Sequence, residues 1–158
     1  MREGETIRPG NGERVTGIRS GLNGGPLIFE FERKPGGKGP PTHTHDESDE
    51  TIEVIDGEIV SCINGEDRLL RAGDRCTLTP AHAHTFWNPS KTNPVRAIVT
   101  RGSRFERMIA QPRLTAMFMY GGFVDSGVSR PRNSASKLLG SIVAWIGRLR
   151  GVRITGVG

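Results

Sequence analysis

Pairs of turn-forming residues divide the middle of this chain into short segments. The pairs Asp56-Gly57, Asn64-Gly65, Ala72-Gly73 and Asn93-Pro94 separate runs that are rich in β-branched, aromatic and alternating apolar residues. The runs are Thr51 to Asp56, Glu58 to Asn64, Arg68 to Arg71, Arg75 to Thr79, His84 to Trp87 and Val95 to Thr100. Short strands at such regular spacing predict an all-β sandwich or barrel.

Composition favours the same fold class. The chain has 158 residues, enough for one domain, and 22 glycines and 10 prolines are more suited to many tight turns than to long helices. A further strand is predicted at Leu27 to Arg33, where Leu27, Phe29 and Phe31 lie on one face. We expect a peripheral strand segment at residues 1–24 and a barrel core at residues 25–101.

The rest of the chain, residues 102–158, is predicted to be a helical extension. Short helices are expected near Phe105 to Ile109 and Leu114 to Phe118, and Ser134 or Ser136 can cap a last helix. That helix has an apolar stripe at helical spacing, formed by Leu138, Leu139, Ile142, Trp145, Ile146 and Leu149. We expect the stripe to pack on the barrel or on a second subunit.

Charge is distributed unevenly along the chain. Residues 1–100 hold 12 Lys and Arg against 15 Asp and Glu, whereas residues 101–158 hold 10 against 2. The basic part lacks interleaved aromatic residues and any DNA-reading motif, so we expect no nucleic-acid partner. The last helix itself has few basic residues, so we expect no membrane partner. No secretory leader, apolar span or cysteine framework is evident, and a cytoplasmic protein with free Cys62 and Cys76 is expected.

Three histidines and one glutamate have the spacing of a metal site. His43 and His45 alternate and can point to the same face of a strand, and Glu50 shares the parity of the apolar Ile52 and Val54. His84 opens a later strand and supplies a fourth ligand. A buried carboxylate needs a cation or hydrogen-bond donors, which a metal shared with the histidines would provide.

The donor set suits one divalent transition metal, Fe, Mn, Ni, Zn, Co or Cu, without selecting among them. Three neutral imidazoles and one carboxylate leave the site at a formal charge of +1, so a small anionic or chelating organic ligand is expected. Asp49 is a rival to Glu50 in the acidic turn that also contains Asp46 and Glu47. His82 is a spare histidine, for which a structural or exposed role is favoured.

These residues resemble the motifs of the cupin superfamily. The first motif is matched at every position by Gly37-x5-His43-x-His45-x4-Glu50-x6-Gly57. The second is matched by Gly73, His84 and Asn88, with Thr79 in place of its proline and Ala81 in place of its glycine. The resemblance implies a double-stranded β-helix, or jelly roll, and a homodimer that pairs through barrel sheets or N-terminal strands.

The resemblance extends to uncharacterised cupins loosely called quercetin-dioxygenase-like, a name that reflects fold more than activity. A metal-dependent enzyme of oxygenase or isomerase type is one hypothesis, with Glu50 as ligand or base. The alternative is a non-catalytic module that binds a small molecule. In a third hypothesis the basic tail binds an acidic partner and the barrel is a scaffold.

Overall fold

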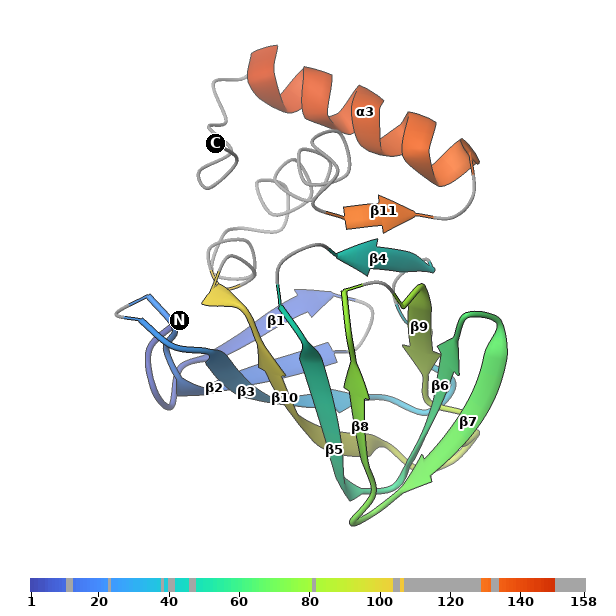
Figure 1. Cartoon of the computed structure of the whole chain (residues 1–158). Helices are drawn as coiled ribbons and strands as arrows, with labels where there is room; N and C mark the ends of the chain where they lie inside the picture. Colours follow the sequence, from blue (N-terminus) through green and yellow to red (C-terminus); the bar gives the residue numbers. More distant parts are fainter. Residues whose placement is uncertain are drawn as a thin grey trace.

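Two antiparallel sheets face each other in the computed structural model, which describes residues 1–10, 13–22, 24–37, 39, 42–45, 48–80, 82–103, 106, 129–131 and 134–149 (Figure 1). The six-stranded sheet has the order β1 (Thr6–Gly10), β2 (Glu13–Arg19), β3 (Leu27–Arg33), β10 (Val95–Arg101), β5 (Glu50–Asp56), β8 (Arg75–Leu78). The five-stranded sheet has the order β11 (Ser129–Pro131), β4 (His43–His45), β9 (His84–Trp87), β6 (Glu58–Ile63), β7 (Glu66–Arg71). The predicted all-β class is confirmed.

The core lies between the sheets and is built from alternate strand positions. In β3 the predicted face of Leu27, Phe29 and Phe31 is buried, and Val95, Ala97 and Val99 of β10 are buried beside it. Strand β5 contributes Ile52 and Val54, and the same cluster includes Val15, Ile59, Leu70, Cys76 and Leu78. Burial of each large apolar side chain stabilises the fold by about 1.5–3 kcal/mol. In strands with period-2 alternation, the face that carries the apolar residues is therefore the face that points inward.

One charged residue, Arg33, also lies on the inward face of β3. Arg33 is buried, and its guanidinium pairs with Glu13 of β2, donates to the carbonyl of Phe86 in β9 at 3.2 Å and lies 4.7 Å from the Phe86 ring centroid. Burial lowers the pKa of Arg33, while the charge and hydrogen bond of Glu13 oppose that shift. Arg33 therefore ties the two sheets together.

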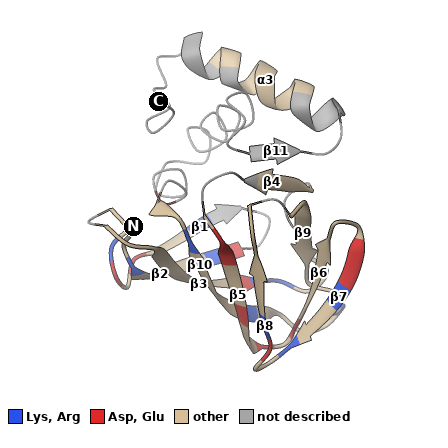
Figure 2. Ribbon diagram, in the orientation of Figure 1, with Lys and Arg blue, Asp and Glu red and all other residues tan. Residues whose placement is uncertain are grey.

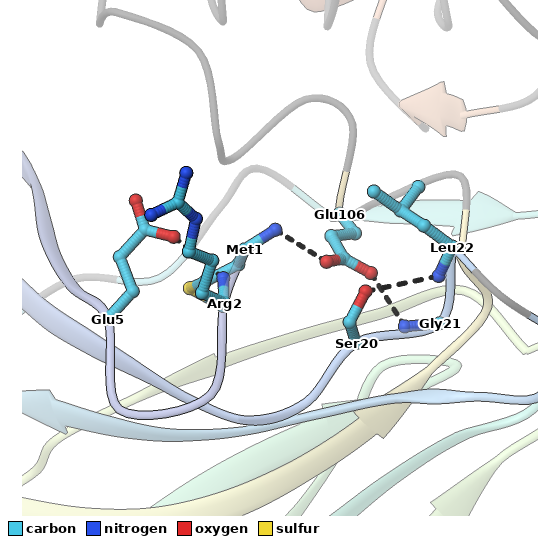
Figure 3. A network of polar contacts seen from close by, with 7 residues as sticks. All are labelled: Met1, Arg2, Glu5, Ser20, Gly21, Leu22 and Glu106. Carbon is cyan, nitrogen blue, oxygen red and sulfur yellow. Dashed lines mark hydrogen bonds and ion pairs between the residues drawn. The ribbon is translucent and has the colours of Figure 1, made fainter.

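The N-terminal segment forms two strands where one peripheral strand was predicted. Strand β1 pairs with β2, and β2 pairs with β3, so the segment extends the six-stranded sheet within the chain. The buried Met1 ammonium lies 2.5 Å from Glu106 Oε1, and Glu106 Oε2 accepts the Gly21 N–H at 2.7 Å (Figure 3). These contacts fasten the first residue and the Gly21 loop to Glu106, which follows β10.

The C-terminal part contributes one strand and one helix to the described structure. Strand β11, which was not predicted, pairs with β4, and α3 (Ser134–Leu149) confirms the predicted last helix. The helices expected near Phe105 and Leu114 lie outside the described residues except for Glu106. Among the described helices, none is both long and apolar enough to cross a membrane.

Of the two surfaces on which the apolar stripe of α3 was expected to pack, the barrel and a second subunit, the barrel does not cover it. The helix lies beside β11, on the side away from the barrel strands (Figure 1). Four residues of the predicted stripe are strongly exposed, Leu138 at 64%, Leu139 at 62%, Ile142 at 46% and Trp145 at 58%, whereas Ile146 is half-buried.

Candidate metal centre

Three of the four predicted ligands come from strands of both sheets and are buried. His43 of β4 and His84 of β9 are cross-strand partners in the five-stranded sheet, whereas Glu50 begins β5 of the six-stranded sheet. The exposed fractions are 5% for His43, 2% for Glu50 and 0% for His84. The fold therefore brings residues distant in sequence to one end of the space between the sheets.

His84 and Glu50 meet across that space. The Nε2 atom of His84 lies 3.5 Å from Oε2 of Glu50, and the rings of His43 and His84 have centroids 4.7 Å apart with an interplanar angle of 50°. Because the histidines and the glutamate belong to opposite sheets, the contact requires the side chains of His84 and Glu50 to point inward. The parity predicted for Glu50, Ile52 and Val54 accounts for this direction.

A backbone carbonyl fixes the orientation of the His84 ring. Its Nδ1 atom lies 2.9 Å from the carbonyl oxygen of His82, and a carbonyl can only accept, so Nδ1 carries the proton. In the neutral imidazole the lone pair then lies on Nε2, the atom that faces Glu50. Metal-binding histidines are commonly oriented in this way through the nitrogen that does not bind the metal.

His82 contacts the centre through its backbone carbonyl, and its side chain contacts Thr79. Its backbone N–H donates to the Thr79 carbonyl at 3.0 Å, and its Nδ1 lies 3.2 Å from the Thr79 hydroxyl oxygen. Thr79 occupies the position where the second motif has proline, so the altered residue helps to hold the loop that carries the His82 carbonyl. Ala81, the other departure from the motif, lies outside the described residues.

Sequence reasoning missed Arg101 as a member of this centre. Its Nε atom lies 3.2 Å from Glu50 Oε2, and its side chain is 16% exposed. The predicted strand ended at Thr100, but β10 continues to Arg101, which has the same parity as the buried Val95 and Val99. That parity was the available signal for an inward guanidinium, which supplies the positive charge that buried Glu50 requires.

The remaining candidates are placed differently. His45 belongs to β4, but its side chain is outside the described part, as are Asp46 and Glu47. Asp49, the rival to Glu50, is exposed. Within the described residues, no three His, Cys, Asp or Glu side chains form a group that could hold a metal ion. Between the predicted ligands, the described geometry includes the His84–Glu50 and His43–His84 contacts.

Asn88 supports the end of the strand that carries His84. It is 2% exposed, and its amide nitrogen donates to the carbonyls of Arg33, Lys34 and Asn93 at 3.3, 3.1 and 2.9 Å. Its amide oxygen accepts the Ser90 N–H at 2.9 Å. Asn88 therefore joins the residues after β9 to the end of β3 and to the turn before β10.

Known proteins resemble this chain in sequence and in fold. The family model described as "Cupin domain" matches residues 29–101. Quercetin 2,3-dioxygenase of Bacillus subtilis is 34% identical over 89 residues, which cover 51% of this chain and 26% of the dioxygenase. The match therefore spans about a quarter of that relative's length.

Solved structures have the same fold. An RmlC-like cupin from Shewanella frigidimarina superposes with a TM-score of 0.54 at 22% identity and covers 61% of this chain and 81% of its own. A cupin-like protein from Thermotoga maritima has a TM-score of 0.54 at 16% identity, with 65% and 80% covered. These likenesses confirm the predicted jelly-roll β-barrel. Together with the family match, they show that residues 29–101 of this chain form a cupin domain.

Proposed function

We propose that the chain holds one divalent transition metal on His43, His45, Glu50 and His84 and presents it to a small anionic or chelating organic molecule. The observation that carries this proposal is the 3.5 Å approach of His84 Nε2 to Glu50 Oε2 between the two sheets. The bond from His84 Nδ1 to the His82 carbonyl supports it, because it directs the unprotonated nitrogen toward the carboxylate.

The chemistry of the donors fits a divalent cation. Neutral imidazole nitrogen and carboxylate oxygen are ligands of Fe, Mn, Co, Ni, Cu and Zn, and the charge of buried Glu50 needs a positive partner. Arg101 fills that need in this structure through its contact with Glu50 Oε2. A bound metal would take over this role, and Arg101 would then be released to face an anionic ligand.

The reaction class we propose is of oxygenase or isomerase type. A bound metal would supply a Lewis acid with positions open to a chelating ligand. The chain's own residues would hold Glu50 and the histidines in place, and Glu50 could also move a proton. The similarity to quercetin 2,3-dioxygenase supports an oxygenase, although it spans only part of that protein.

Dioxygen uptake tests the enzymatic proposal. Protein loaded with iron, manganese or nickel is assayed with a flavonol, a diketone and a thiol, and at least one combination is expected to consume dioxygen. Glu50→Gln should abolish that uptake, whereas Glu53→Gln, which changes an exposed glutamate of the same strand, should retain it. Isomerisation of a chelating substrate is followed separately by NMR.

The same assay distinguishes the alternative, a non-catalytic binding module. Saturable binding of a chelating ligand that depends on Glu50, without dioxygen uptake or isomerisation, would assign the chain to that alternative. Absence of both binding and turnover in metal-loaded protein would contradict the proposal in both forms.

We also propose that the chain forms a homodimer. Strand β1 is one of the two outer strands of the six-stranded sheet, and an outer strand offers backbone groups to a second sheet. Light scattering coupled to gel filtration is expected to give twice the chain mass, and a monomeric mass over a range of concentrations would contradict this proposal.

A further inference from the structure

The apolar stripe of α3 is a continuous exposed surface. Leu138, Ile142 and Trp145 follow one another at spacings of four and three residues, and Leu139 widens the stripe on one side. All four are between 46% and 64% exposed. An apolar helical face of this kind is a site of interaction, since single exposed apolar residues are common but contiguous ones are not.

The charged residues in the sequence segment that contains α3 have one sign. Residues 126–158 contain six basic residues and no acidic one; the basic residues are Arg130, Arg132, Lys137, Arg148, Arg150 and Arg153. In the sequence of α3, Lys137 directly precedes Leu138, and Arg148 follows Trp145 by three residues. Figure 2 shows the described part of α3 in tan, the colour of residues other than Lys, Arg, Asp and Glu.

This charge pattern discriminates between a second copy of α3 and an anionic lipid surface as the binding partner of the stripe. A second copy of this segment would add the same positive charges, and residues 126–158 contain no acidic residue to neutralise them. An anionic lipid surface matches both features, because it accepts apolar side chains below the headgroups and attracts Lys and Arg at their level. Tryptophan is suited to that boundary.

We propose that α3 is a docking surface for an anionic phospholipid membrane, on which it lies with Leu138, Leu139, Ile142 and Trp145 inserted. This departs from the expectation that the chain has no membrane partner. It is independent of the proposed metal centre, because none of its residues belongs to that centre. The barrel would then be held at the membrane surface by its C-terminal part.

Vesicle flotation of the full chain tests the proposal. The probes are vesicles of phosphatidylcholine alone and of phosphatidylcholine with 30% phosphatidylglycerol, at 0.1 M salt. Binding is expected to the anionic vesicles only and to weaken as salt is raised. In the Trp87→Phe background Trp145 is the sole tryptophan, and its emission should shift to the blue when the anionic vesicles are added.

Two double variants separate the contributions of the apolar and of the charged side chains to membrane binding. Leu138→Ser with Ile142→Ser should weaken partitioning more than tenfold. Lys137→Gln with Arg148→Gln should weaken it about 20-fold on anionic vesicles. Matched controls change an exposed leucine and an exposed lysine of the barrel, Leu22→Ser and Lys91→Gln, and should leave partitioning unchanged.

Several outcomes would overturn the proposal. Equal binding to both vesicle types would show that charge plays no part in binding. Absence of binding to either type would show that the stripe does not dock on a membrane. A dimer that becomes monomeric in the Leu138→Ser, Ile142→Ser variant would assign the stripe to a second copy. Emission of Trp145 that is already blue-shifted without vesicles would show that the protein itself covers the stripe.

Discussion

His84 Nε2 lies 3.5 Å from Glu50 Oε2, although the two residues belong to different sheets. The contact exists because β5 begins and β9 begins at the same end of the barrel, with Glu50 and His84 each on the inward face. Arg101 approaches the same carboxylate oxygen at 3.2 Å. The Arg101 guanidinium and the candidate metal site therefore share the buried carboxylate of Glu50.

Arg101→Gln should destabilise the metal-free protein and strengthen its binding of metal. Loss of the guanidinium leaves Glu50 buried without that counter-charge, which is expected to lower the free energy of unfolding by about 1–3 kcal/mol. A divalent metal should restore that stability, since a ligand that binds the native state stabilises it by mass action. Thermal unfolding with and without added metal measures both effects.

The control for this variant is Arg96→Gln, which removes a more exposed arginine of the same strand. It is expected to change the free energy of unfolding by less than about 1 kcal/mol and to leave metal binding unaltered. If metal stabilised wild-type protein and Arg101→Gln equally, competition between Arg101 and metal for Glu50 would be ruled out.

Glu106→Gln should destabilise the protein in a pH-dependent manner. Burial raises the pKa of Glu106, but hydrogen bonds from the Met1 ammonium, the Gly21 N–H and the Ser20 hydroxyl, with the ammonium charge, hold it below its usual value. A carboxyl whose pKa is lowered by folding stabilises the native state above its unfolded pKa, near 4.3. That contribution is lost as pH falls through the lower folded pKa.

At pH 7 the free energy of unfolding of wild-type protein should thus exceed that of Glu106→Gln by about 2–4 kcal/mol. The difference should shrink below about pH 4. Urea unfolding at a series of pH values measures it. Glu32→Gln, which removes the partly exposed partner of Arg14, is the control and should cost less than about 1 kcal/mol. Parallel pH profiles for wild type and Glu106→Gln would show that the ionised carboxylate contributes nothing specific.

Asn88→Asp should be more harmful than its small change in shape suggests. The amide nitrogen of Asn88 donates to three backbone carbonyls, and a carboxylate oxygen in its place would be an acceptor facing acceptors. We expect a loss of about 2–4 kcal/mol in the free energy of unfolding. Asn93→Asp, at an exposed side chain nearby, should have little effect. Equal unfolding midpoints for the two variants would refute this account of Asn88.

Alternation of apolar residues predicted the barrel because each core strand has one buried face. Leu27, Phe29 and Phe31 of β3 show the pattern directly, and the predicted bounds of β3 and β9 agree with those observed. Strand β11 could not be found in this way, because Ser129, Arg130 and Pro131 have no apolar pattern. It is a strand only because the edge of β4 offers it hydrogen-bond partners.

The candidate site was predictable where ligand chemistry coincides with strand parity. His43, His84 and Glu50 are residue types that call for a partner when buried, and their inward positions follow from the neighbouring apolar residues. Arg101 and Arg33 also lie on inward positions, but a charged residue at the end of a strand is usually exposed, so parity alone did not identify them. Their burial depends on Glu50 and Glu13, contributed by other strands.

Metal content tests the central claim most directly. Wild-type protein, His84→Ala, Glu50→Gln and Glu53→Gln are purified without an affinity metal, checked for folding by circular dichroism, and analysed for transition metals by mass spectrometry. Wild type and Glu53→Gln are expected to hold about one metal per chain, and His84→Ala and Glu50→Gln at least tenfold less after dialysis. Equal metal content in all four folded proteins would contradict the assignment of the site.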